Sequence, residues 1–226
     1  MRRLLLASAI VLLAGCKASA PPAVKIETDE QKALYSLGYL VAGNVKPFEL
    51  TDEELAAVKL GFADGAQQKK GVVEDPQTFI PKLQELQAKR AEAAAKREKE
   101  AGAAYLAKAA EAPGATKLPS GVIVTTITEG TGPNPAATDT VKVHYHGTLV
   151  DGKVFDSSVE RKEPATFPLN GVIPCWTEGV QKIKVGGNAK LICPSDLAYG
   201  DRGSPPQIGP GATLIFDVEL LEIVKK

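Results

Sequence analysis

The sequence predicts an α+β protein, in which an N-terminal all-helical module and a long spacer helix precede a C-terminal antiparallel β-sheet wrapped on a short helix. Three observations lead to this prediction. Helix start signals cluster before residue 80, an alanine-rich charged stretch runs almost without glycine or proline to residue 111, and β-branched, alternating segments follow residue 114. A length of 226 residues is enough for two modest domains.

Residues 1–15 have the pattern of a signal peptide. Arg2 and Arg3 give a positive start, and residues 4–14 form an apolar stretch that is too short to cross a bilayer. Cys16 directly follows two small residues, which resembles the bacterial lipobox and predicts a lipid on Cys16 after cleavage before it. An ordinary secretory signal, with Cys16 incidental, is the alternative.

The segment after Cys16 predicts how the protein is attached. Residues 16–27 are small, contain prolines and lack periodicity, as in a flexible tether. Several acyl chains anchor a protein firmly, so the lipid would be its only contact with the membrane. Lys17 stands where an aspartate would retain a lipoprotein at the inner membrane. We therefore expect a protein of the bacterial cell envelope, at the outer membrane, facing the periplasm or the cell surface.

The charge balance excludes one class of partner. The chain has 27 basic and 27 acidic residues, and without the two arginines of the predicted leader 25 basic residues face 27 acidic ones, a net charge of −2. Binding to a phosphate backbone depends on clustered lysine and arginine. Because no such basic patch emerges, nucleic acid is not an expected partner.

The first helix of the module is expected to begin at Asp29 as its N-cap. Leu34, Leu37 and Val41 follow at helical spacing and form one apolar face. Gly38 lies inside the same pattern and lowers helix propensity. Its presence indicates that another helix approaches closely at this point.

The second helix is predicted by a capping box formed by Thr51 and Glu54. Its apolar face consists of Leu55, Val58 and Phe62. Helical faces this narrow cannot bury a convincing core for the predicted module of residues 28–115. We therefore expect a homodimer that pairs through residues 28–90.

The third helix is expected to start at Asp75 and Pro76 and to continue to about Glu111. After Leu86, alanine and charged residues replace the apolar ones, so the helix should stand in water as a semi-rigid spacer. A helix of this length would project about 50 Å. Disorder is the alternative for the charged part, but alanine and straight-chain charged residues favour a helix.

The sequence pattern typical of a β-sheet begins after Pro113 and Gly114. Asp151-Gly152 is a strong hairpin signal between two apolar segments. The segments with strand patterns are 121–128, 141–150, 189–193 and 213–224, and a short helix is expected over 174–183.

Two histidines offer a weak metal signal. His144 and His146 lie two residues apart on a predicted strand, so both side chains point to the face opposite Tyr145. A metal site needs a third ligand, and no nearby cysteine or carboxylate is suggested. We expect exposed surface histidines, with no metal and no cofactor.

Five short strings in the C-terminal half carry a family resemblance. They are VHYHG (143–147), KVFDSS (153–158), GVIPCWTEGV (171–180), LAYGDRG (197–203) and ATLIFDVELL (212–221). In order, spacing and flanking glycines they resemble the FKBP-type peptidyl-prolyl cis-trans isomerases. The strings YSLGYLVAG (35–43) and GFADG (61–65) are similar to the N-terminal dimerisation domain of the FkpA and macrophage infectivity potentiator lipoprotein group. The resemblance implies an FKBP-like isomerase domain over residues 116–226.

The resemblance implies an apolar pocket that rotates X-Pro bonds without a covalent step. Trp176 would form its floor, and the Ile173 amide and the Tyr199 hydroxyl would bind substrate carbonyls. Asp156 would face the rotating carbonyl or fix nearby side chains. The other implied pocket residues are Tyr145, Phe155, Phe167, Val172, Ile208 and Phe216. Simple core packing of these aromatic residues is the alternative.

The implied partners are proline-containing unfolded or exported polypeptides. Ala165 stands where familiar members carry an aromatic residue, and Gly209 stands where proline is usual. A lower pocket wall and a more mobile flap are expected, which leaves macrolide binding open. Chaperone activity is expected beside isomerisation. The alternative is a dimeric periplasmic chaperone, or a surface interaction or virulence factor, with incidental isomerase activity.

Cys175 and Cys193 are the two cysteines that remain if Cys16 carries lipid, an even number in an oxidising compartment. Relatives carry glycine and an aliphatic residue at these two places. Two departures together suggest a disulfide, worth about 3 kcal/mol if unstrained. Two buried thiols are the alternative.

Overall fold

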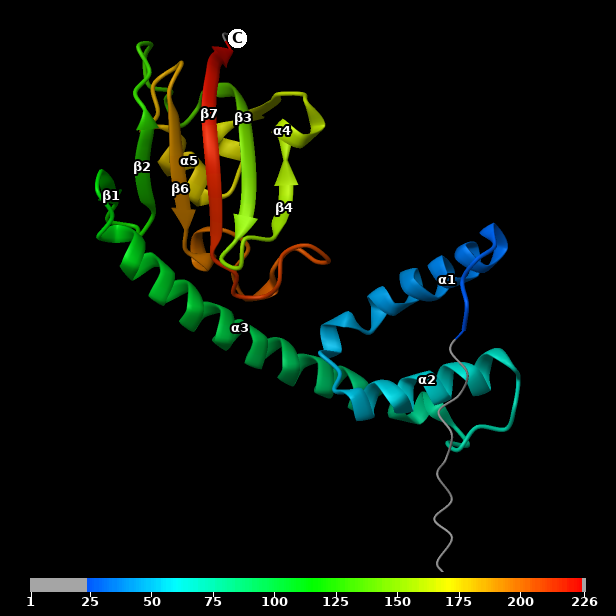
Figure 1. Ribbon diagram of the computed structural model, residues 1–226. Coiled ribbons are helices and arrows are strands. Elements are labelled where there is room, and N and C mark those ends of the chain that lie inside the picture. Colours follow the sequence, from blue (N-terminus) through cyan, green and yellow to red (C-terminus); the bar gives the residue numbers. More distant parts are fainter. Residues whose placement is uncertain (1–23, 225–226) are drawn as a thin grey trace, which may run out of the picture. The chain divides into compact units, whose positions relative to one another are not determined.

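The computed structural model describes residues 24–224 (Figure 1). Of these residues, 24–42 belong to one unit and 43–224 to a second. The predicted signal peptide (1–15) and Cys16 lie outside the described residues. Between residues 24 and 224, no helix combines the length and the hydrophobicity that crossing a membrane requires.

The first unit contains helix α1 (Asp29–Val41). Its N-cap is Thr28 and not Asp29: the Thr28 hydroxyl accepts from the Gln31 amide at 3.2 Å, and the Gln31 side chain accepts from the Thr28 amide at 3.0 Å. Asp29 instead lies in the first turn, where its charge favours the helix N-terminus. No residue of α1 is buried, and its exposed apolar side chains are Leu34, Tyr35, Leu37, Tyr39, Leu40 and Val41.

Helix α2 (Asp52–Ala66) opens the helical part of the second unit. The predicted capping box is confirmed: the Glu54 amide donates to the Thr51 hydroxyl at 3.3 Å, and the Thr51 amide donates to the Glu54 carboxylate at 2.9 Å. Arg90, on the next α-helix, α3 (Ile80–Ala110), also binds this carboxylate. The hydrogen bond from Arg90 lowers the pKa of Glu54 to about 2. The cap of α2 thereby connects α2 to α3.

Helix α3 (Ile80–Ala110) follows a short 3₁₀ helix over Pro76–Phe79. The expectation that it stands in water beyond Leu86 holds for most of its residues but is wrong at Ala94, Ala95 and Gly102. Ala95 and Gly102 are buried in contacts with other parts of the unit, and a Cβ added at Gly102 would lie 3.0 Å from the Cβ of Thr213. Small residues let the backbones approach, so α3 docks without a stripe of large apolar side chains.

The sheet is antiparallel throughout. Its strands are β1 (Ala115–Lys117), β2 (Ile123–Thr128), β3 (Thr140–Leu149), β4 (Val154–Ser157), β5 (Ala165–Pro168), β6 (Asn188–Cys193) and β7 (Leu214–Val224). The spatial order is β1-β2-β6-β7-β3-β4, and β5 pairs with β3 at residues that precede those paired with β4. At the predicted hairpin, Gly152 has a φ of 85°, and the Leu149 amide donates to the Lys153 carbonyl at 2.9 Å.

Two helices cover the two faces of this sheet. Helix α5 (Pro174–Val180) packs on one face, over the main hydrophobic core (Figure 1). The opposite face presents Ile123, Ile192 and Ile215, one from each of three strands. Tyr105 and Leu106 from the last turns of α3 pack on these isoleucines. The C-terminal end of α3 is therefore part of the sheet domain's packing.

The two histidines of β3 lie under the short helix α4 (Ser158–Arg161). His144 Nδ1 is 3.2 Å from the Ser158 hydroxyl, and His146 Nδ1 is 3.0 Å from the Ser157 hydroxyl. Both rings are half-buried, so the expectation of exposed histidines is wrong. In the part of the chain described by the structure, no group of three His, Cys, Asp or Glu residues could hold a metal.

Gly102→Ala should lower the free energy of unfolding by about 1–3 kcal/mol, because the new methyl group collides with Thr213. In an open helix the same change would stabilise the protein by about 1 kcal/mol. Denaturant unfolding measures the difference, with the exposed Ala104→Ser on the same helix as control. Thr213→Ala should relieve part of the loss. A more stable Gly102→Ala protein would contradict the docking of α3.

Candidate active site

Trp176 is the centre of the candidate site. It lies in the first turns of α5, where Pro174 occupies the first helical position and needs no partner for its nitrogen. Its ring meets Tyr145, Phe167 and Phe216 edge to face, with centroids 5.4, 5.7 and 5.2 Å away. Its Nε1–H has no hydrogen-bond acceptor among residues 24–224. Ring contacts from three strands therefore hold the indole in place.

A cavity of about 510 Å³ opens beside this indole, although Trp176 itself is only 4% exposed. Its lining residues are Tyr145, Phe155, Asp156, Phe167, Gly171, Val172, Ile173, Trp176, Tyr199 and Phe216. Nine of the ten residues predicted for the site lie in this lining. Segments far apart in the sequence, from β3 to β7, thus converge on one hollow.

Two residues differ from the expectation. Ile208 is absent from the lining and is buried in the core instead, where its amide and carbonyl pair with those of Ser204 at 3.0 and 2.9 Å. Gly171 does line the cavity and was not predicted, because a glycine carries no side chain whose chemistry would single it out.

The polar side of the cavity is a group of three side chains. The Tyr145 hydroxyl donates to Asp156, and Arg161 donates to the other carboxylate oxygen of Asp156. Arg161 also donates to the Tyr145 oxygen at 3.0 Å, and its guanidinium carbon lies 5.7 Å from the Tyr145 ring centroid. Sequence reasoning missed Arg161. Its position at the end of α4, five residues after Asp156, is the signal that could have pointed to it.

The hydrogen bonds of this group fix its charges. Burial raises the pKa of Asp156, but hydrogen bonds from Tyr145 and Arg161 outweigh burial, so the pKa of Asp156 lies below its usual value. Burial and the neighbouring carboxylate raise the pKa of Tyr145. At neutral pH the site therefore holds a carboxylate and a neutral phenol. Neither group is tuned to exchange a proton near that pH.

Two hydrogen-bond donors remain at the rim. Ile173 is the N-cap of α5, and within residues 24–224 its amide makes no backbone hydrogen bond. Tyr199 lines the cavity and is 42% exposed, so a bound chain can reach its hydroxyl. Both groups are available to carbonyl oxygens of an incoming chain.

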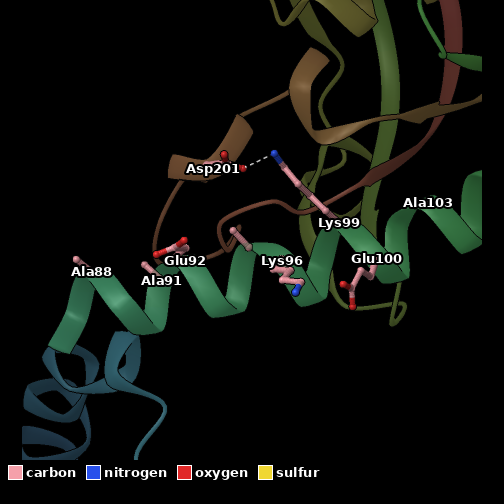
Figure 2. Close-up of a pocket in the computed structure, with 9 residues that line it drawn as sticks. Ala88, Ala91, Glu92, Lys96, Lys99, Glu100, Ala103 and Asp201 are labelled. Atoms are coloured by element: carbon pink, nitrogen blue, oxygen red, sulfur yellow. Dashed lines mark ion pairs between the residues drawn. The ribbon is translucent and has the colours of Figure 1, made fainter. Parts of the chain in front are cut away.

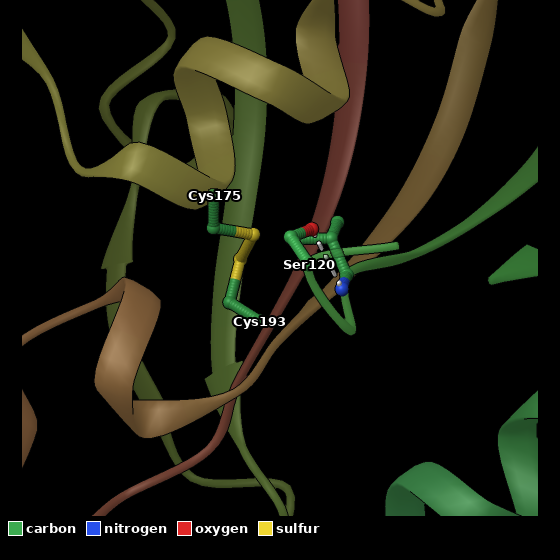
Figure 3. Close-up of a disulfide and its surroundings, with 4 residues drawn as sticks. Ser120, Cys175 and Cys193 are labelled. Atoms are coloured by element: carbon green, nitrogen blue, oxygen red, sulfur yellow. Dashed lines mark hydrogen bonds between the residues drawn. A yellow bond between two sulfur atoms is a disulfide. The ribbon is translucent and has the colours of Figure 1, made fainter. Parts of the chain in front are cut away.

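A disulfide joins Cys175 and Cys193, with their Cα atoms 5.6 Å apart (Figure 3). It connects α5, one residue before Trp176, to the end of β6. Both cysteines are completely buried. The alternative of two buried thiols is therefore wrong in this structure. The bond holds the helix that carries Trp176 to a central strand.

Comparisons with known proteins agree with this architecture. The family model for FKBP-type peptidyl-prolyl cis-trans isomerase matches residues 132–221, and that for the domain amino terminal to it matches residues 30–123. The FkpA isomerase of Aeromonas hydrophila is 40% identical over 92% of this chain and 82% of its own length. The outer membrane protein MIP of Legionella longbeachae is 37% identical over 100% of this chain and 99% of its own. The crystal structure of FkpA from Escherichia coli is similar with a TM-score of 0.66, at 37% identity, and the match covers 88% of this chain and 98% of that one.

Arg161→Gln should raise the pKa of Asp156, because burial remains while one of the two side-chain donors is lost. A carboxylate with a lowered pKa stabilises the fold above its unfolded pKa, and this stabilisation is lost as pH falls through the folded pKa. In the variant the loss should occur at higher pH. NMR titration of the Asp156 carboxyl carbon measures it. Lys162→Gln removes the same charge from the next residue and is the control; equal titration curves for Arg161→Gln and the unchanged protein would contradict the assigned contact.

Proposed function

The chain belongs to the FKBP-type peptidyl-prolyl cis-trans isomerases, and we propose that it rotates X-Pro bonds of exported polypeptides in the cavity beside Trp176. The observation that carries the proposal is an aromatic cavity with two hydrogen-bond donors at its rim, the Ile173 amide and the Tyr199 hydroxyl, and a carboxylate that already accepts hydrogen bonds from Tyr145 and Arg161. Such a site can bind and twist an amide. It contains no arrangement for nucleophilic attack.

The reaction requires no bond to break. The peptide C–N bond has partial double-bond character, which sets a barrier of about 18–20 kcal/mol. At the top of the barrier the amide is twisted and has lost its charge-separated resonance form, so it is less polar than either planar form. An apolar, water-excluding site therefore favours the twisted amide over the planar ones, and catalysis follows from that difference in binding.

Each part of the site has a role in this proposal. The proline ring lies on Trp176, between the aromatic walls. The Ile173 amide and the Tyr199 hydroxyl hold substrate carbonyls on either side of the rotating bond. Asp156, fixed by Tyr145 and Arg161, presents a permanent negative charge next to the carbonyl that turns. Because these groups are in place before substrate arrives, little reorganisation is needed.

Tyr199→Phe should lower kcat/KM for a proline peptide by about 3- to 10-fold, because one hydrogen bond to a carbonyl is lost. Asp156→Ala should lower it by at least about 10-fold, because Tyr145 and Arg161 lose their common acceptor. A cis-to-trans isomerisation assay measures both. Ile127→Ala, which changes a 57% exposed residue of β2 outside the cavity, should leave the rate unchanged. Full activity in both site variants would remove the assignment of the site.

We propose further that the N-terminal helices pair two copies of the chain, through residues 28–90. Leu34, Leu37 and Leu40 of α1 are 62%, 59% and 75% exposed. A soluble protein seldom leaves such a contiguous apolar face in water unless a partner covers it. The match of residues 30–123 to the family's amino-terminal domain supports the same use of this segment.

Leu37→Asp should shift the protein from dimer to monomer, because a charge at the centre of an apolar interface is strongly unfavourable. Sedimentation equilibrium at several concentrations measures the change. Ser36→Asp adds the same charge to the same helix about 100° around its axis from Leu37, where Ser36 donates to the Lys32 carbonyl, and should leave the dimer intact. A monomeric unchanged protein, or equal dissociation in both variants, would contradict the proposed pairing.

The remaining parts of the proposal concern location and clients. We infer a lipid on Cys16 and an envelope location, supported by the LAGC string and by the full-length similarity to a relative named as an outer membrane protein. Chaperone activity and macrolide binding stay predictions of the family resemblance. Macrolide binding depends in part on Ala165 in β5, which stands where familiar family members carry an aromatic residue and would make one wall of the pocket lower.

A further inference from the structure

Two short 3₁₀ helices flank Tyr199 in the sequence. They are η5 (Ser195–Leu197) and η6 (Gly200–Arg202), and each carries one acidic residue, Asp196 and Asp201. Tyr199 lines the cavity, and its side chain is 42% exposed. Its position depends on the backbone segment that the two 3₁₀ helices form on either side of it.

Lys99 of α3 bridges these two helices. Its Nζ lies 2.7 Å from Asp201 and 3.4 Å from Asp196, and Figure 2 shows it extending from α3 toward Asp201. The hydrogen bond that Lys99 donates to Asp201 raises the pKa of Lys99, so the ammonium stays charged. One cation thus holds a carboxylate three residues before Tyr199 and another two residues after it.

Backbone packing fixes α3 against the same segment. Gly211 lies so close to α3 that an added Cβ would be 2.9 Å from the Cα of Ala95, which is one helical turn before Lys99. The Gly211 amide donates to the Gly200 carbonyl at 2.9 Å, directly after Tyr199. The helix therefore reaches the Tyr199 segment through an ion pair on one side and through close backbone contact on the other.

We propose that Lys99 is a positioning residue for Tyr199, which makes α3 part of the catalytic unit and not only a connection to the N-terminal helices. The inference rests on the proposed function, in which the Tyr199 hydroxyl binds a substrate carbonyl. Lys99 does not line the cavity and acts only through the two 3₁₀ helices.

The test compares Lys99→Gln with Lys96→Gln in the full chain. Lys96 lies on the same helix, makes no ion pair within residues 24–224 and points away from Asp201 in Figure 2. Lys99→Gln should lower kcat/KM for a proline peptide by about two- to fivefold, the effect typical of an exposed ion pair. Lys99→Arg, which keeps the charge, should recover most of the rate, and Lys96→Gln should not change it.

A double-mutant cycle separates positioning from general loosening. If Lys99 acts through the Tyr199 hydroxyl, Lys99→Gln should have no effect on kcat/KM in the Tyr199→Phe background. Thermal unfolding of each variant shows whether the fold is kept. An effect of equal size in both backgrounds, or equal rates for Lys99→Gln and Lys96→Gln, overturns the inference while leaving the isomerase function intact.

A second measurement, which does not depend on isomerase activity, tests the positioning role even if the proposed function is wrong. The ring resonances of Tyr199, followed by NMR, should shift and broaden in Lys99→Gln and remain unchanged in Lys96→Gln. Absence of isomerisation in the unchanged protein would count against the proposed function, and unchanged Tyr199 resonances in Lys99→Gln would count against the positioning role.

Discussion

The edge-to-face packing of three aromatic rings around Trp176 is the interaction on which the rest of the site depends. Tyr145, Phe167 and Phe216 come from three different strands, so the indole is correctly placed only when the sheet is complete. The disulfide at Cys175 then holds the helix that carries the indole to β6. The indole's polar hydrogen has no acceptor in the described residues, so no hydrogen bond of the ring helps to keep it in place. The hollow above the ring is what this packing leaves open.

The polar part of the site complements that packing, because its hydrogen bonds are made within the protein. Asp156 binds Tyr145 and Arg161 at the same time, and its pKa lies below the usual range as a result. A carboxylate held in this way stays charged and does not swing toward a substrate proton. The chemistry that remains is to bind a twisted amide better than a planar one, which suits a reaction with a purely torsional barrier.

Much of this architecture could be predicted from local sequence. The Thr51 capping box and the turn at Asp151-Gly152 depend on neighbouring residues only, and both occur as expected. The short sequence strings that resemble the family predicted most of the residues that line the cavity. The docking of α3 could not be predicted, because Ala95 and Gly102 form a contact surface by being small and so leave no apolar period. Strand β5 has only four residues, too few to show an alternation. Arg161 follows Asp156 by five residues in the sequence, but its role became clear only from its contact with the Asp156 carboxylate.

The close approach of Gly102 to Thr213 has a mechanical consequence. If α3 turned about its own axis, a neighbouring side chain would be driven into Thr213, the residue before β7, because the close contact leaves no gap there to absorb it. The contact therefore resists rotation of the helix about its axis. Thr213 stands three residues before Phe216, which lines the cavity. A rotation of α3 would therefore strain the cavity wall that Phe216 forms.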